Sequence, residues 1–344
     1  MGKHRAALKD FDTAIGLRPD YALAYYNRGV SKAMLGQGQD AIRDCDSAVQ
    51  LNPDNAEIYF GRGMVSLILG QYTDAIKDYD AAIKLEPDSA VTHYERGIAN
   101  AFLRQYSEAI KDYDTAIRLK SDYAVAYYNR GIANAHLRQY SEAITDYDTA
   151  IQLKPDYAAA YYNRGIAKAN LGQYSDASKD CDAAIQLNPD SAEAYACKGM
   201  AKVELEQYKA AIADCDTAIQ LNPDLAEAYA YRGAAKVELE QYKAAIADCD
   251  TAIQLNPNSA YAYTYRGLAK ANLGQYNSAI NDYSKAIELQ PKATLAYYNR
   301  GLARYKLRRN FGAKSDLQTA LRLAKQAGNK TLHTEIQVKL RKRF

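Results

Sequence analysis

The sequence predicts an all-helical solenoid of repeated two-helix hairpins, and three spacings predict it. All eight prolines are separated by multiples of 34 residues, and a glycine stands ten residues after each of them. Alanines recur with the same period, in one column from Ala41 to Ala313 and in another from Ala48 to Ala320. A proline fixes its own backbone and disfavours helix at the residue before it, so it marks a recurring boundary. Small residues at fixed points indicate helices in close contact.

Each 34-residue unit holds two helical patterns joined by a short polar link. In residues 155–188, Gly165 and Ala169 belong to the first pattern, and Ala177 and Cys181 belong to the second. Apolar or small residues at steps of three and four are typical of one buried helix face. The proline is expected to end the second helix, so the unit is predicted to be a helical hairpin.

The elements follow one another without an insertion in the 34-residue register. We expect the chain to begin with a single helix, the second half of a repeat, and to end with a basic amphipathic helix that caps the last repeat. The predicted boundaries are a half repeat at 1–21, eight tandem repeats at 22–293, a divergent ninth repeat at 294–327 and the capping helix at 328–344.

The period, the central glycine, the two alanine positions and the closing proline resemble the tetratricopeptide repeat (TPR) family. The resemblance implies a right-handed superhelical solenoid of antiparallel helix hairpins, in which the first helices line a concave groove. Two columns differ from the family pattern. Tyrosine replaces the usual first-helix tryptophan at most repeats, and the residue before the central glycine is basic throughout, from Arg28 to Arg300.

Composition excludes several classes of protein. The 344 residues are 48% hydrophobic and 25% charged, which is far from the signature of disorder. No apolar run is long enough to span a membrane, and the first residues lack a signal peptide, so a cytoplasmic protein is expected. The five cysteines are too few for a disulfide framework. Four of them share one core column, where stacked repeats are expected to hold them too far apart to bond.

The polar columns predict structure rather than catalysis. An aspartate column on the second helices runs alongside the basic column, which favours a ladder of ion pairs; a stripe of arginines that binds anions is the alternative. The D-x-D triplets do not predict a metal site, because residues two apart on a helix point away from each other. Almost every polar residue is one of many copies, so no catalytic residue, metal or cofactor is expected, and the chain is not expected to be an enzyme.

The concave groove is the predicted binding site for a protein or peptide of unknown identity. The family resemblance implies that the residues seven, eight, eleven and fifteen positions after each proline slot face the groove. The first half of this surface is aromatic and aliphatic, and the second half is polar with Glu204 and Glu238. The tyrosine column can instead pack between neighbouring repeats. The predicted groove residues are Tyr26, Asn27, Phe60, Tyr94, Phe102, Tyr128, Asn129, Tyr162, Asn163, Tyr298 and Asn299.

The C-terminal end offers a second surface. Residues 292–344 carry 14 Lys or Arg and two acidic residues, a net charge of +12, which leaves −9 for residues 1–291. The alternatives to a peptide-binding scaffold are therefore contact with nucleic acid or an anionic surface, which the sequence favours less, and a structural spacer. Self-association through the open N-terminal helix or head to tail is a further hypothesis. The predicted basic patch is Arg308, Arg309, Lys339, Arg341, Lys342 and Arg343.

Overall fold

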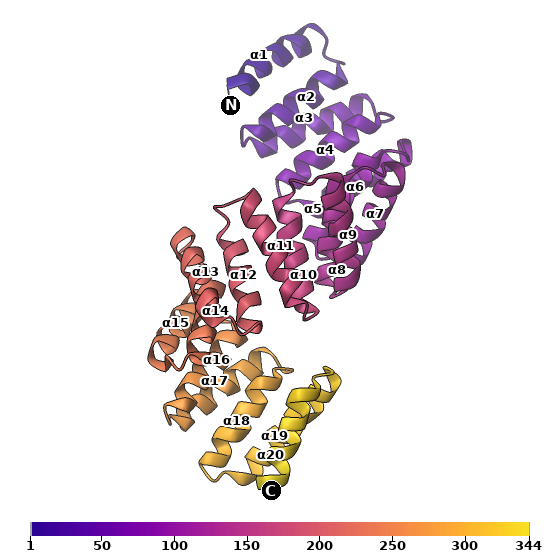
Figure 1. Ribbon diagram of the computed structural model, residues 1–344. Coiled ribbons are helices and arrows are strands. Elements are labelled where there is room, and N and C mark those ends of the chain that lie inside the picture. The colour runs from indigo at the N-terminus through magenta and orange to yellow at the C-terminus, as the bar shows by residue number, and fades with distance from the viewer. Residues whose placement is uncertain (1, 344) are drawn as a thin grey trace. The chain divides into compact units, whose positions relative to one another are not determined.

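The computed structural model describes the backbone of residues 2–343 and the side chains of residues 4–342, and this part of the chain holds helices and no strand (Figure 1). Nine consecutive helix pairs lie between a single helix α1 (Gly2–Leu17) and a terminal helix α20 (Lys330–Arg343). The first helices of the pairs are α2 (Ala22–Met34), α4 (Ala56–Ile68), α6 (Ala90–Phe102), α8 (Ala124–His136), α10 (Ala158–Asn170), α12 (Ala192–Glu204), α14 (Ala226–Glu238), α16 (Ala260–Asn272) and α18 (Thr294–Lys306). The second helices are α3 (Gly38–Leu51), α5 (Tyr72–Leu85), α7 (Tyr106–Leu119), α9 (Tyr140–Leu153), α11 (Tyr174–Leu187), α13 (Tyr208–Leu221), α15 (Tyr242–Leu255), α17 (Tyr276–Leu289) and α19 (Asn310–Gln326).

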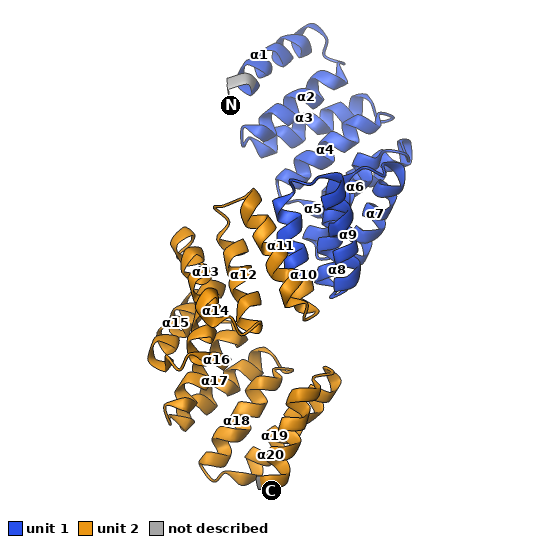
Figure 2. Cartoon of the chain, viewed as in Figure 1, with its two compact units in different colours: residues 1–167 blue, residues 168–344 orange. Residues whose placement is uncertain are grey.

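The helices form two compact units, unit 1 with residues 1–167 and unit 2 with residues 168–344 (Figure 2). The boundary falls inside α10. Within each unit, successive helix pairs stack on one another, which confirms the predicted all-helical solenoid. Among the described helices, none combines the length and the apolar character that a membrane span needs.

A left-handed residue at the end of each first helix reverses the chain. In the first pair, Gly36 has a φ of 77° and donates its N–H to the carbonyl of Ala33, while Gln37 donates to the carbonyl of Lys32. Two such bonds past the last turn satisfy carbonyls that the helix leaves unpaired. The second helix ends at Leu51, two residues before the proline slot, because the residue before a proline avoids the helical region.

The central glycine of each repeat lets the two helices of a hairpin approach closely. A Cβ on Gly97 would lie 2.6 Å from the Tyr113 ring, so only glycine leaves room for the ring there. Tyr113 is 1% exposed and closes the core of its hairpin. In other repeats the sulfur of a cysteine, such as Cys249 beside Gly233, takes the place of the ring. This confirms that these cysteines are small substitutes in a core column.

The basic column forms the predicted ladder of ion pairs. Arg130 donates from Nε and Nη2 to the Asp146 carboxylate of its own repeat, and from Nη1 to Asp114 of the preceding repeat at 2.5 Å. Its guanidinium also lies over the Tyr127 ring, 5.4 Å from the centroid. Asp146 is buried, and a buried carboxylate needs a charged, hydrogen-bonded partner to stay ionised. The arginines therefore hold carboxylates of the chain itself, which favours the structural interpretation over an anion-binding stripe.

The ladder also explains the D-x-D triplets. Arg130 contacts one aspartate 16 residues ahead and another 16 residues behind, and most residues of the basic column repeat this pattern. The next basic residue lies 34 residues further on. The aspartate 16 residues after one basic residue and the aspartate 16 residues before the next are therefore two positions apart on the same second helix. One aspartate thus faces its own repeat and the other faces the next. The pairs that cross between repeats are Asp12–Arg28, Asp46–Arg62, Asp80–Arg96, Asp114–Arg130, Asp148–Arg164, Asp182–Lys198, Asp216–Arg232 and Asp250–Arg266.

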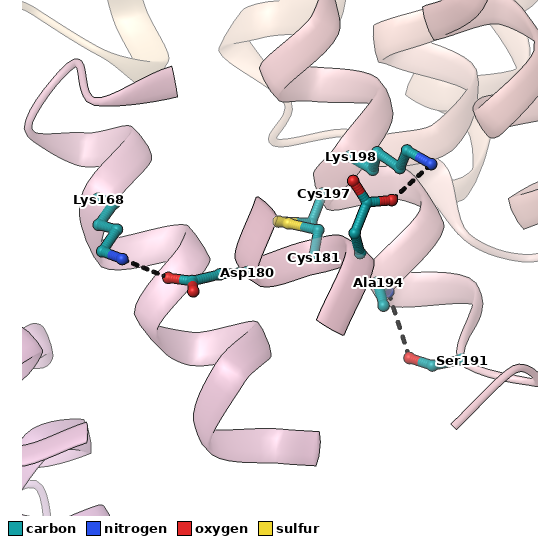
Figure 3. The surroundings of a disulfide bond; sticks show 8 residues. Lys168, Asp180, Cys181, Ser191, Ala194, Cys197 and Lys198 are labelled. Atoms are coloured by element: carbon teal, nitrogen blue, oxygen red, sulfur yellow. Dashed lines mark hydrogen bonds and ion pairs between the residues drawn. A yellow bond between two sulfur atoms is a disulfide. The ribbon is translucent and has the colours of Figure 1, made fainter. Parts of the chain in front are cut away.

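One disulfide corrects the expectation that the cysteines do not bond. Cys181 on α11 is bonded to Cys197 on α12, and their Cα atoms are 6.2 Å apart (Figure 3). The expectation compared cysteines of the same column only. The register that pairs Asp182 with Lys198 at 2.7 Å also brings together the residues one position before each of them. Those residues are the two cysteines, so the cross-link lies directly beside an ion pair of the ladder.

Thiol counting tests this assignment. Cys45, Cys215 and Cys249 are free and buried, and burial raises the pKa of each thiol to about 12. We expect three titratable thiols in protein unfolded without a reductant and five after reduction, measured by alkylation and mass spectrometry. Because the bond closes a loop of 16 residues, its reduction should destabilise unit 2 by about 3 kcal/mol. Five thiols in unreduced, unfolded protein would show that the bond does not form.

Candidate binding groove

A cavity of about 530 Å³ opens between the first helices of two neighbouring repeats in unit 1. Side chains of α6 and α8 form its walls, and Tyr106 and Tyr113 of α7 lie between them. On α8 the lining positions are three and four residues apart, which places them on one face of the helix. The lining residues are Ile98, Ala101, Phe102, Tyr106, Tyr113, Asn129, Ile132, Ala133 and His136.

Stacked rings hold the edges of this cavity in place. Phe102 is 60% exposed and stacks on Tyr72 of the preceding repeat, with ring centroids 4.8 Å apart. His136 stacks in the same way on Tyr106 at 4.5 Å. Each of these rings has lost conformational freedom before any partner arrives, which lowers the entropic cost of binding. An exposed phenyl ring at the rim of an apolar cavity is a surface suited to an apolar side chain.

The predicted tyrosine column packs between neighbouring repeats. Tyr94 lies between the Tyr113 and Tyr123 rings, at centroid distances of 5.9 and 5.0 Å. Tyr128 makes the equivalent contacts one repeat later, and the Tyr26 ring covers the backbone of Gly61. Phe60 packs on a core tyrosine and lines a smaller cavity of about 170 Å³. Tyr162 is half-buried on α10. These tyrosines therefore pack between neighbouring repeats, which was the alternative interpretation of this column.

The asparagines of the predicted ladder orient these rings. Asn129 donates from Nδ2 to the Tyr94 hydroxyl at 2.8 Å, and Asn163 donates to the Tyr128 hydroxyl at 2.9 Å. Asn27 bonds instead to the carbonyl of Leu23 in its own helix. Asn299 is half-buried on α18. Asn129 and Phe102 are the two predicted residues that share the large cavity.

Tyr298 corrects one prediction. It is 6% exposed, packs with Ile336 of α20, and donates from its hydroxyl to Glu335. The terminal helix covers it, so it belongs to the core of the last repeat and is left out of the candidate site.

Three of the four repeats of unit 2 have Ala196, Ala230 or Thr264 at the position of the aromatic column. Ala196 and Ala230 stand where unit 1 has tyrosine or phenylalanine, and each is only 3% exposed. With these small residues, α12, α14 and α16 pack directly against one another. Tyr261 and Tyr265 of α16 lie over the resulting surface, with ring centroids 4.5 Å apart.

Burial changes the ionisation of the acidic residues in unit 2. Burial raises the pKa of Glu204 and of Glu238 above the ordinary value for glutamate. Glu204 accepts a hydrogen bond from the Tyr174 hydroxyl, which partly offsets this rise. Both residues nevertheless remain exposed to solvent, on a surface where the sequence predicted a polar groove.

The basic C-terminal residues surround an apolar contact. Ile336 is fully buried, and Leu332 and Leu340 pack with it against α19. Arg308, Arg309, Arg341 and Lys342 are exposed, and Lys339 is half-buried. The Arg309 guanidinium donates to Asn277 of the preceding repeat. The Arg343 side chain lies outside the described residues.

Models of one family match most of the chain. Those described as TPR repeat match residues 66–101, 104–137, 138–172 and 270–307. Those described as tetratricopeptide repeat match residues 22–55, 45–77, 158–191, 192–225, 226–259 and 249–281. The chain belongs to the tetratricopeptide repeat family. The TPR repeat is thus seen both in the succession of helix pairs and in the amino-acid sequence.

Solved structures share the TPR fold. A tetratricopeptide repeat protein from Parabacteroides merdae is 20% identical, with a TM-score of 0.60 over 72% of this chain and 98% of that one. A chain of the APC/C hetero-tetramer Cut9–Hcn1 is 18% identical, with a TM-score of 0.60 over 87% of this chain and 58% of that one. MamA is 28% identical, with a TM-score of 0.46 over 48% of this chain and 96% of that one. No curated protein matches the sequence.

Sequence reasoning missed parts of the site that come from second helices of the TPR hairpins. Tyr72 and Tyr106 begin second helices and were not among the predicted groove residues, yet they support the exposed rings of the next repeat. Their spacing of 34 residues was visible, but the stacking depends on how one repeat sits on the next. Among the described residues, no three His, Cys, Asp or Glu side chains are arranged to hold a metal ion.

Proposed function

We propose that this TPR chain is a non-enzymatic protein-interaction scaffold that binds a partner segment on the groove face of unit 1. One observation carries the proposal: the cavity between α6 and α8 has an exposed Phe102 ring at its rim and apolar walls. Rigid aromatic side chains around a pocket are typical anchors of protein interfaces. The segment would place an apolar side chain in the cavity, while the ion-pair ladder keeps the repeats in register.

The proposal is tested with a displayed library of random peptides as the probe. Peptides enriched on the whole native chain are measured again on Phe102→Asp. Because Phe102 is exposed, the substitution leaves the core intact and places a charge at the rim of an apolar site. We expect affinity to fall about tenfold or more.

The chain offers a matched control. Phe311 on α19 is 93% exposed, so Phe311→Asp makes the same chemical change far along the sequence from the cavity. Peptides that bind Phe102→Asp as tightly as native protein would contradict the proposal. So would equal losses in both variants, or no enrichment on native protein.

A further inference from the structure

A carboxylate without a cationic partner lies on the same helix face as the cavity wall. Glu95, Ile98 and Phe102 occupy positions i, i+3 and i+7 of α6, which share one face of a helix. The residue one repeat later than Glu95 is Asn129, which lines the cavity. Among the described residues, no Lys, Arg or His makes an ion pair with Glu95. It therefore differs from the buried aspartates of the ladder, each of which has a basic partner.

Three tyrosines interact electrostatically with this carboxylate. The charge of Glu95, together with burial as the larger cause, raises the pKa of Tyr79, Tyr94 and Tyr123. Burial likewise raises the pKa of Glu95 itself. The four groups belong to α5, α6 and the residue before α8. A desolvated carboxylate attracts a cation more strongly than an exposed one.

A second observation concerns the ring next to this carboxylate. Asn129, the equivalent of Glu95 one repeat later, donates to the hydroxyl of Tyr94, and the equivalent of Tyr94 one repeat earlier is Phe60. By the same register Glu95 lies next to the Phe60 ring, which has no hydroxyl to bond with it. The Phe60 ring packs beside Tyr79, with centroids 5.9 Å apart, and aromatic faces attract cations. A carboxylate next to an aromatic ring suits an ammonium or guanidinium group.

We propose that the partner segment carries a lysine or arginine that binds at Glu95, next to the apolar side chain in the cavity. The inference rests on the proposed function and adds the chemistry of the partner. Glu95 and Phe102 are about 10 Å apart along the helix, a length that about three residues of extended chain span. The basic and apolar residues of the segment should have that spacing. Residues 1–291 carry a net charge of −9, which also favours a basic partner.

The test compares the peptides that a random displayed library yields on three whole chains: native, Glu95→Gln and Glu142→Gln. Glu142 is exposed on α9 and serves as the matched control for loss of one negative charge. We expect native protein and Glu142→Gln to enrich peptides with Lys or Arg about three residues from a large apolar residue. Glu95→Gln should keep the apolar preference and lose the basic one. A native-selected peptide should bind Glu95→Gln about tenfold more weakly.

The outcomes separate the two proposals. Enriched peptides that depend on Phe102 but show no basic preference would overturn this inference and leave the cavity proposal standing. A basic preference that persists in Glu95→Gln would also overturn it. A basic preference that disappears in Glu95→Gln but ignores Phe102→Asp would support the cation site and contradict the cavity.

Discussion

Replacing Arg130 by alanine is expected to destabilise unit 1 by roughly 3–5 kcal/mol. The Asp146 side chain is 4% exposed, and without Arg130 its charge would be buried with only the Asn134 amide as a partner. Asp114 is 53% exposed, so losing its contact should add less than about 1 kcal/mol because water screens that pair. Denaturant unfolding monitored by circular dichroism measures the change.

Two further variants make this result specific. Arg118 is exposed in the last turn of α7, so Arg118→Ala should change stability little. Arg130→Lys keeps the charge but loses the planar fork of donors, so its cost should lie between the two. The chain already has a lysine at this position of one repeat, where Lys198 reaches Asp214 at only 3.7 Å. Equal midpoints for Arg130→Ala and Arg118→Ala would show that the ladder contributes no stability.

Alkaline pH is expected to unfold unit 1 as its buried tyrosines ionise. Tyr79, Tyr113 and Tyr147 are at most 1% exposed, and burial raises the pKa of each well above its ordinary value of 10.0. Burial also raises the pKa of Tyr157 to about 12. Above pH 10 the unfolded chain loses protons that the folded chain retains, so the free energy of unfolding falls as pH rises. Three such groups lower it by about 4 kcal/mol per pH unit.

The measurement follows tyrosinate absorbance and helix content together while pH is raised. Exposed tyrosines such as Tyr21 should ionise first, without loss of helix. The remaining tyrosinate signal should appear in one transition with the loss of helix, since the core hydroxyls ionise only when the helices separate. Tyr79→Phe removes one of these hydroxyls, one that has no hydrogen-bond partner, and should move the transition to higher pH. Ionisation of all tyrosines near pH 10 with the helices intact would contradict the prediction.

The fold could be predicted because the 34-residue period repeats its evidence many times. The ion-pair ladder was half predicted: the aspartate column from Asp10 to Asp316 was found, whereas the second aspartate of each triplet was judged only as a chelating partner of the first. Its true partner lies 16 residues further on, in the next repeat. The Cys181–Cys197 bond was missed for the same reason, since a comparison within one column does not reveal contacts between columns.

The candidate site was predicted less completely, because its shape depends on packing between repeats. The sequence placed Phe102 and Asn129 on the groove face, and both line the cavity. It could not show that Tyr94 would be held between two rings, or that Tyr298 would be covered by α20. Both outcomes depend on the distance between neighbouring first helices. That distance is set by side chains that lie far apart in the sequence.

The ladder register has an evolutionary consequence. Each repeat offers an arginine or lysine toward the repeat before it and an aspartate toward the repeat after it, so most junctions use the same chemistry. Duplicating or deleting a whole repeat therefore creates no unmatched charge, whereas inserting one residue would misalign two carboxylates at once. Arg300 is the exception, since it meets Ser284 instead of an aspartate on the preceding repeat. Adding repeats by unequal exchange of gene segments is thus easiest among the repeats that precede Arg300.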